Sequence, residues 1–208
     1  MNIIDISWPI SPDMTTYRNK KDVMFSGTRF YHVERVRESH IMMGSHTGTH
    51  VDAPYHILEH GGGVDHIPLE SLIGHAAVID LTYVEDVITA QDLEQFDLQK
   101  GLIILLKTRN SGLTEIAPFE PEFISLDKDA AAYCVERGFK AVGIDYLGIE
   151  RGQPDHDTHK ILLQNNIALI EGLRLFDIEM GYYFFVCLPL LLAGLDAAPA
   201  RAILLEDF

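Results

Sequence analysis

The sequence of 208 residues contains only two cysteines, Cys134 and Cys187. Both lie among apolar neighbours, so we predict buried free thiols rather than a disulfide. The length is sufficient for one domain with a sizeable core. Hydrophobic residues make up 47% of the chain, which excludes general disorder. We therefore expect a single globular domain over residues 1–208.

Basic residues are scarce. The chain has 16 Lys and Arg against 31 Asp and Glu, which gives a formal net charge of −15. Nucleic acids and anionic membranes attract basic surfaces, so this balance argues against both as partners.

Long hydrophobic runs are missing as well. The longest run, from Tyr182 to Leu192, contains Pro189 and is too short to span a bilayer. The first residues, Met1 to Asp5, lack the basic and apolar regions of a signal peptide. A Gly-x-Ser-x-Gly motif is also absent, so the sequence gives no sign of a serine nucleophile. These absences together favour a cytoplasmic enzyme.

The greatest density of chemically active side chains lies between Gly44 and His56. Polar positions alternate with β-branched residues from His46 to Asp52, which predicts a strand with its polar groups on one side. In a straight strand, His46 and His50 would lie roughly 13 Å apart. Imidazole nitrogens bind a transition metal at about 2.0–2.1 Å, so the chain has to fold back between the two histidines. Gly48 is the residue that permits a bend there.

We interpret His46, His50 and Asp52 as metal ligands. Pro54 ends the strand and leaves His56 beside the ligands, where we expect it to transfer protons. The alternative is a polar, histidine-rich surface edge. A single histidine would favour that alternative, whereas three histidines and an aspartate in one bent run favour a metal site.

A second candidate region contains His159 and Glu171. Residues 167–170 form a predicted buried strand, and Glu171 stands directly at its end. A carboxylate in that place is costly unless it is paired with a cation or bound to a metal. A salt bridge with Arg174 and a metal site both fit the sequence. His159 lies twelve residues earlier, with one helix and one strand between, so the two ends can meet.

The run His46-Thr-Gly48-Thr-His50-Val-Asp52-Ala-Pro54-Tyr-His56 resembles a family signature, His-x-Gly-x-His-x-Asp-x-Pro-x-His. That signature belongs to the cyclase family of metal-dependent hydrolases, which includes bacterial kynurenine formamidases and isatin hydrolases. The resemblance extends over nearly the whole chain. It implies an α/β fold of the swivelling β/β/α type, a single domain with a central barrel-like mixed β-sheet flanked by helices. It also implies assembly as a homodimer or homotetramer.

The resemblance implies the remaining ligands too, because the family carries a His and a Glu at the spacing of His159 and Glu171. By its position in the pattern, His159 is preferred to the nearby His156. Two divalent ions per chain are implied, and the ligands divide between them as follows: His46 and His50 on one ion, His159 on the other, Asp52 and Glu171 shared. Imidazole and carboxylate ligands without thiolate fit Zn²⁺ first, with Mn²⁺ as the alternative.

For the activity, the resemblance implies hydrolysis of an aryl amide such as N-formyl-L-kynurenine to formate and kynurenine. Metal-activated water would attack, with His56 as general acid and base. The alternatives are hydrolysis of a cyclic amide such as isatin, a non-hydrolytic cyclase or dehydratase, and a metal-binding domain without catalysis.

The family's substrate loop usually carries an aromatic residue followed by Pro-Gly. In this chain Tyr17 is the aromatic residue, Arg18-Asn19 follows it, and the formamidase branch has Trp at this place. We expect Tyr17 to contact the substrate. The alternative is that Tyr17 and Trp8 are aromatic residues packed on a surface loop.

Sequence patterns also predict the regular elements. Strands are expected over residues 3–7, 30–37, 76–82, 102–106, 140–145, 167–170, 182–188 and 202–205. Helices are expected over residues 90–96, 127–137 and 159–164, with a last helical turn over 173–178. Thr89 with Asp92 can cap the first helix, and Gly138 can end the second. The alternation of strands and helices predicts α/β organisation.

Overall fold

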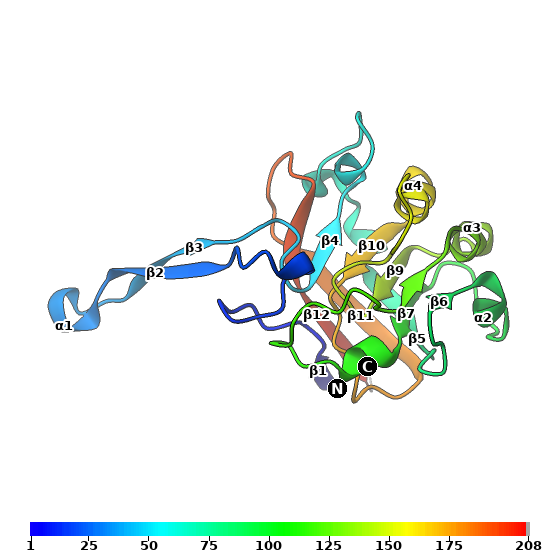
Figure 1. Cartoon of the computed structure of the whole chain (residues 1–208), viewed down its shortest axis with the longest axis horizontal. Coiled ribbons are helices and arrows are strands. Elements are labelled where there is room, and N and C mark those ends of the chain that lie inside the picture. The colour runs from blue at the N-terminus through cyan, green and yellow to red at the C-terminus, as the bar shows by residue number, and fades with distance from the viewer. Residues whose placement is uncertain (207–208) are drawn as a thin grey trace.

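The computed structural model describes residues 1–206, and its centre is a closed β-barrel (Figure 1). In order around the barrel, its strands are β12 (Ala197–Glu206), β11 (Gly181–Pro189), β5 (Ile73–Asp80), β7 (Ile103–Lys107), β9 (Ala141–Ile144), β10 (Ala168–Glu171) and β4 (His50–Asp52). Strand β4 pairs back onto β12 and closes the ring, while β1 (Asn2–Asp5) pairs with the C-terminal part of β12. Strands β5, β7, β9 and β10 run parallel, and the other barrel pairings are antiparallel. The predicted α/β domain with a barrel-like mixed sheet is confirmed.

Two apolar layers hold the barrel together. The inner layer fills the barrel with side chains from all of its strands, among them Val51, Val78, Leu105, Ile170, Phe185 and Leu204. The outer layer packs the opposite faces of β5, β7, β9 and β10 against three helices, α2 (Ala90–Glu94), α3 (Lys128–Arg137) and α4 (Asp157–Gln164). The central parallel strands are therefore buried on both faces, as their continuous apolar runs predict. Both cysteines are fully buried and unpaired, as expected.

The helix ends follow local sequence chemistry. Thr89 and Asp92 form a capping box at the start of α2, in which the Thr89 backbone N–H donates to Oδ2 of Asp92 at 2.8 Å. Asp127 caps α3 by accepting from the backbone N–H of Ala130 at 2.7 Å. Gly138 ends α3 with a φ of +68°, a conformation that glycine adopts without a steric penalty. The Thr89–Asp92 cap and the Gly138 stop are thus as predicted.

A long arm extends from the body of the molecule (Figure 1). It consists of β2 (Met24–Arg29), a single helical turn α1 (Tyr31–Glu34) and β3 (Glu38–Met42), with β2 and β3 paired antiparallel. The strand predicted over residues 30–37 is wrong, because this segment forms the tip of the arm. Residues 30–37 alternate in polarity, but all of them are exposed, so no buried face selects an extended backbone.

Two other expectations need correction. The strand of the metal motif covers only His50–Asp52, because a turn and a bend occupy the residues before it. Residues 173–178 form no helix; Leu173 makes a β-bridge with Ser7 instead. Pro199 lies within β12, where it faces His50 across the strand pair. A small parallel pair, β6 (Val87–Ile88) with β8 (Ser125–Leu126), lies outside the barrel sheet. The helices found within residues 1–206 are all too short or too polar to span a bilayer.

Candidate metal centre

The candidate ligands of the barrel lie on its outer side. In the antiparallel pairing of β4 with β10, Glu171 lies opposite His50. The intervening residues Val51 and Ile170 are opposite each other and belong to the apolar filling of the barrel. Successive side chains of a strand point to opposite faces, so His50, Asp52 and Glu171 all project away from the barrel interior. Barrel closure therefore brings the two predicted halves of the site together.

Gly48 provides the bend that the sequence requires. Its φ is +62°, in the left-handed region. The bend places the rings of His46 and His50 with centroids 5.0 Å apart. Its carbonyl oxygen also lies 2.9 Å from Nδ1 of His50, which leaves the Nε2 of that histidine facing the carboxylates. The predicted fold-back between the two histidines is confirmed.

Asp52 and Glu171 have the same relation to His50 and His159. One oxygen of Asp52 lies 3.0 Å from Nδ1 of His46 and 3.4 Å from Nε2 of His50, and its other oxygen lies 3.5 Å from Nε2 of His159. Glu171 has one oxygen 3.3 Å from Nε2 of His50 and the other 3.5 Å from Nε2 of His159. Each carboxylate thus faces His50 with one oxygen and His159 with the other.

Several of these polar atoms are buried without a hydrogen bond. Within residues 1–206, they include Nε2 of His50 and both carboxylate oxygens of Asp52. A buried polar group without a partner is expensive, and divalent cations bound among these groups would satisfy all three atoms. The donor set of imidazoles and carboxylates suits Zn²⁺ or Mn²⁺. The residues present therefore fit the metal that the sequence predicts.

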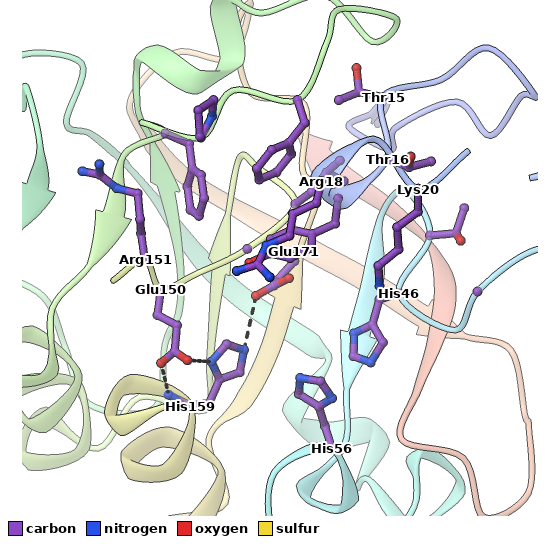
Figure 2. A pocket seen from close by; sticks show the side chains of 18 of the residues that line it. Thr15, Thr16, Arg18, Lys20, His46, His56, Glu150, Arg151, His159 and Glu171 are labelled. Atoms are coloured by element: carbon purple, nitrogen blue, oxygen red, sulfur yellow. Dashed lines mark hydrogen bonds and ion pairs between the residues drawn. The ribbon is translucent and has the colours of Figure 1, made fainter. Parts of the chain in front are cut away.

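An oxygen atom lies near the outer nitrogen of each of the three predicted histidine ligands. For His50 it is the Gly48 carbonyl. For His46 it is Asp196, whose Oδ2 lies 2.9 Å from Nε2. For His159 it is Glu150, whose Oε1 lies 3.0 Å from Nδ1, as Figure 2 shows. Such partners orient a metal-binding imidazole and fix which nitrogen faces the metal.

Sequence reasoning missed both Asp196 and Glu150. Asp196 lies in the loop before β12, and Glu150 lies in the loop after β9. Neither belongs to a motif. The available signal was that Glu150 directly follows the apolar pair Gly148-Ile149, as Glu171 follows its own apolar strand. His156, which we placed outside the ligand set, contacts the same Glu150 oxygen with its Nδ1.

His56 differs from the other histidines. It is half-buried in a short turn, Pro54–His56, and its ring centroid lies 4.2 Å from that of His46 and 5.5 Å from that of His159. Its nearest carboxylate oxygen at ion-pair distance is Oδ2 of Asp196, 3.9 Å from Nδ1. Burial is the main reason that the pKa of His56 is lowered. A neutral imidazole in this place can accept a proton.

In contrast to His56, His50 and Asp52 have pKa values that are shifted in favour of their charged forms. Burial alone would lower the pKa of His50, but Asp52 and Glu171 raise it to about 10. Burial would raise the pKa of Asp52, but the adjacent imidazoles of His159, His46 and His50 hold it well below its usual range. Both carboxylates are thus ionised, and the cluster attracts positive charge, whether protons or metal ions.

Glu171 does not form the salt bridge considered as an alternative. Arg174 pairs with Glu115 instead, at 3.2 Å, and its guanidinium lies over the ring of Trp8. Besides its contacts with histidines, Glu171 accepts a hydrogen bond from the backbone N–H of Ile149 at 2.7 Å. Its carboxylate is therefore free of any arginine partner among the described residues.

A cavity of about 1150 Å³ opens above the cluster. Its floor includes His46, His56, His159 and Glu171, which Figure 2 shows side by side. Its wall includes aromatic and basic residues, namely Tyr17, Phe119, Phe123, Arg18, Lys20 and Arg151. Tyr17 thus lines the cavity, as a residue that contacts the substrate would. Trp8 does not line the cavity; it is buried and packs edge-on against Tyr146.

Comparison with known proteins gives consistent matches. The Cyclase family model matches residues 4–151. A solved structure described as a potential metal-dependent hydrolase with cyclase activity is 43% identical, has a TM-score of 0.89 and aligns over 99% of both chains. Cyclase-like protein 3 of Oryza sativa subsp. japonica is 34% identical over 98% of this chain and 80% of its own length. The kynurenine formamidase of Salinibacter ruber is 31% identical over 98% of this chain and 97% of its own.

Proposed function

Since this chain belongs to the cyclase family of metal-dependent hydrolases, we propose that it is a metal-dependent amidohydrolase that cleaves an aryl amide such as N-formyl-L-kynurenine to formate and kynurenine. The observation that carries the proposal is the arrangement of Asp52 and Glu171, each with one oxygen toward His50 and the other toward His159. Such an arrangement suits a pair of ions that share two carboxylates.

The ligand assignment follows from which nitrogens face the carboxylates. His46 and His50 would hold one ion, and His159 the other, with Asp52 and Glu171 contacting both. Zn²⁺ is our first choice and Mn²⁺ the second. When bound, a pair of divalent ions supplies a water of lowered pKa and an electrophile for the amide carbonyl.

His56 supplies the proton transfer. Its neutral imidazole would take a proton from the attacking water and return that proton to the amine that leaves. His46, Asp52 and His56 are close enough together to form a metal-binding group, so His56 as a third histidine ligand is the alternative. Its nearest ion-pair partner, Asp196, is 3.9 Å away, farther than the carboxylates beside His46 and His159, and this distance favours the proton-transfer role.

The wall of the cavity supports a substrate with an aromatic ring and an anionic group. Tyr17 and Phe119 meet edge-on with centroids 4.9 Å apart, and could hold an aryl ring. Arg18 and Lys20 both lie over the ring of Tyr17, and Figure 2 shows them in the cavity above Glu171 and His46. Among residues 1–206, neither forms an ion pair.

Two unpaired cations in a chain with a net charge of −15 suit recognition of a substrate carboxylate. The loop that carries them is also strained. Arg18, Asn19 and Lys21 have φ values of 54°, 56° and 52°. Residues held in such conformations often belong to binding sites. N-formyl-L-kynurenine has both the aryl ring and the carboxylate that these residues would contact.

Substrate assays with metal-stripped and reloaded protein test the proposal. Protein loaded with Zn²⁺ or Mn²⁺ should release formate from N-formyl-L-kynurenine, and chelator should abolish the reaction. Arg18→Ala and Lys20→Ala should raise KM for this substrate but not for formanilide, which lacks a carboxylate. Lys21→Ala is the matched control, because Lys21 is equally close in sequence but does not line the cavity. Preference for isatin would favour the cyclic-amide alternative, and no cleavage of any amide with either metal would overturn the proposal.

A further inference from the structure

Asp145 is a buried carboxylate that lies outside the metal cluster. It directly follows β9, and its exposed fraction is 0%. It does not line the cavity, so it can act on a substrate only through other residues. A carboxylate buried in this way is expensive unless hydrogen bonds replace the lost water. The groups that supply those hydrogen bonds indicate what Asp145 does.

Five hydrogen-bond donors from the turn after β7 surround Asp145. The backbone N–H groups of Thr108 and Ser111 donate to Oδ2 at 2.7 and 3.1 Å. Their hydroxyls donate at 2.8 and 2.7 Å, and the side-chain amide of Asn110 donates to Oδ1 at 3.4 Å. Burial raises the pKa of Asp145, and hydrogen bonding to Ser111 and Thr108 opposes that effect. The carboxylate thus holds the turn together.

Asn110 links this turn to a second point on the chain. Its side-chain amide donates to the carbonyl oxygen of Ile124 at 2.9 Å, and its Oδ1 accepts from the Ile124 N–H at 2.8 Å. The turn and Ile124 enclose residues 112–123, which we call the wall segment. Asp145 therefore fixes one end of the wall segment directly and the other end through Asn110. The wall segment contributes three residues to the cavity, Phe119, Pro121 and Phe123.

The wall segment in turn holds the loop of residues 15–20. The hydroxyl of Thr15 donates to the carbonyl oxygen of Ala117 at 2.6 Å. The backbone N–H of Phe119 donates to Oδ1 of Asn19 at 2.9 Å. The position of the wall segment therefore sets the place of the proposed substrate contacts on this loop, Tyr17, Arg18 and Lys20.

We infer that Asp145 is a positioning residue for substrate binding, because it holds the wall segment and, through it, the loop of residues 15–20 beside the cavity. The inference rests on the proposed function, since the substrate contacts named there are the ones held in place. Asp145→Asn keeps the shape of the side chain, but in either orientation its NH2 group faces N–H donors. Donors that face each other cannot form hydrogen bonds, so the turn and the wall segment should shift. The predicted metal ligands lie on other elements and should stay in place.

Steady-state kinetics with the metal-loaded enzyme test the inference. In Asp145→Asn, KM for formanilide and for N-formyl-L-kynurenine should rise roughly 3–10-fold, the range that one well-placed aromatic contact contributes. The value of kcat should stay within about twofold, because a lost binding contact raises KM, whereas a smaller folded fraction lowers kcat. Asp80→Asn is the matched control, since Asp80 ends β5, accepts from Thr82 and does not line the cavity.

A second variant tests the link between the two ends of the wall segment. Asn110→Ala keeps the Asp145 carboxylate and removes both hydrogen bonds to Ile124. It should raise KM for the two substrates in the same direction, and it provides the test if Asp145→Asn does not fold.

Trp8 gives a measurement that needs no substrate. It is the single tryptophan of the chain, it is buried, and its Nε1 donates to the carbonyl oxygen of Glu115 in the wall segment at 3.3 Å. Acrylamide should quench its emission more strongly in Asp145→Asn and Asn110→Ala than in Asp80→Asn. If the native protein cleaves no amide, the proposed function fails, and the quenching alone decides whether Asp145 holds the wall segment. Unchanged KM or unchanged quenching in both variants, or loss of bound metal in step with activity, would overturn the inference.

Discussion

Oε1 of Glu150 lies 3.0 Å from Nδ1 of His159, on the side of the ring away from Asp52 and Glu171. The contact fixes the imidazole with Nε2 toward the proposed metal. Glu150 also accepts from the backbone N–H of His159 at 3.2 Å, so it holds both the side chain and the helix that carries it. The charge on this carboxylate is retained because hydrogen bonding to His159 lowers its pKa despite burial.

Removal of Glu150 should therefore weaken metal binding without removing a ligand. We expect Glu150→Ala to reduce metal affinity by roughly 10–100-fold, the usual effect of losing such a partner. Competition with a chromogenic chelator measures it. Glu122→Ala is the control, since Glu122 is an exposed carboxylate that pairs with Arg151. Equal affinities in the two variants would show that Glu150 has no part in orienting His159.

Replacement of His56 separates proton transfer from metal binding. We expect His56→Ala to retain its metal and to lose activity by about 10²-fold or more. Metal content by atomic emission and kcat with N-formyl-L-kynurenine give the two values. His66→Ala, in which the removed side chain is 73% exposed, should change neither. Parallel loss of metal and activity would identify His56 as a ligand instead.

Replacement of Glu171 tests whether two ions share carboxylates. Glu171→Gln loses the charge and one of the two oxygens that face His50 and His159. We expect this variant to hold at most one tightly bound ion per chain. Quantification of metal after dialysis decides the matter, with Glu179→Gln as the control, since Glu179 is exposed in the loop before β11. Two ions per chain in Glu171→Gln would remove the sharing from our proposal.

The metal-free protein should have a defined range of pH for maximum stability. The neighbouring carboxylates raise the pKa of His50 from 6.5 to about 10, so its contribution is complete below pH 6.5 and is lost as pH rises through 10. Hydrogen bonding to His159 and His50 lowers the pKa of Glu171 from 4.5 to about 2 against the effect of burial. Its contribution is complete above pH 4.5 and is lost as pH falls through 2.

We therefore expect the chelator-treated protein to be most stable between pH 4.5 and 6.5. Urea unfolding across the pH range measures this. Metal should move the maximum to higher pH, because binding requires the histidines in their neutral form. A metal-free protein whose stability rises steadily from pH 6.5 to 9 would contradict the assignment of charge to this cluster.

Gly172 is required by close backbone contact as well as by its conformation. Its φ is +74°, and a Cβ added there would lie 2.3 Å from the carbonyl oxygen of Gly48. Gly101 has a φ of +82° with nothing within 4 Å of such a Cβ, so it isolates the cost of conformation. We expect Gly101→Ala to cost about 1 kcal/mol and Gly172→Ala to cost about 3 kcal/mol or more of unfolding free energy. Equal losses would show that the backbone yields at Gly172.

The sequence was most informative where chemistry is concentrated along the chain. The bend at Gly48 followed from the short bond between an imidazole nitrogen and a metal. The need of Glu171 for a cation or a metal followed from its place at the end of an apolar strand. Asp196 and Glu150 were not identified as site residues because each is a single acidic residue in a loop. The pairing of β4 with β12 brings Asp196 to His46, and the path of the chain between β9 and α4 brings Glu150 to His159. Neither arrangement can be predicted from one acidic residue.

The prediction of a strand over residues 30–37, at the tip of the arm, failed for a different reason. Alternation of polarity predicts a strand when one face is to be buried, and the single chain offers the arm no surface to bury against. Residues 30–37 therefore follow local preferences, with Glu34 accepting from the backbone N–H of Phe30 at 2.9 Å around the helical turn.

In strands β4 and β10, alternate residues have different roles. Val51 and Ile170 fill the barrel, while their neighbours His50, Asp52 and Glu171 form the proposed metal cluster on its outer side. Folding and chemistry thus place separate demands on adjacent positions. The loops that wall the cavity can change in length and composition without disturbing the barrel, so laboratory evolution aimed at residues 15–20 should yield new substrate ranges at little cost in thermal tolerance.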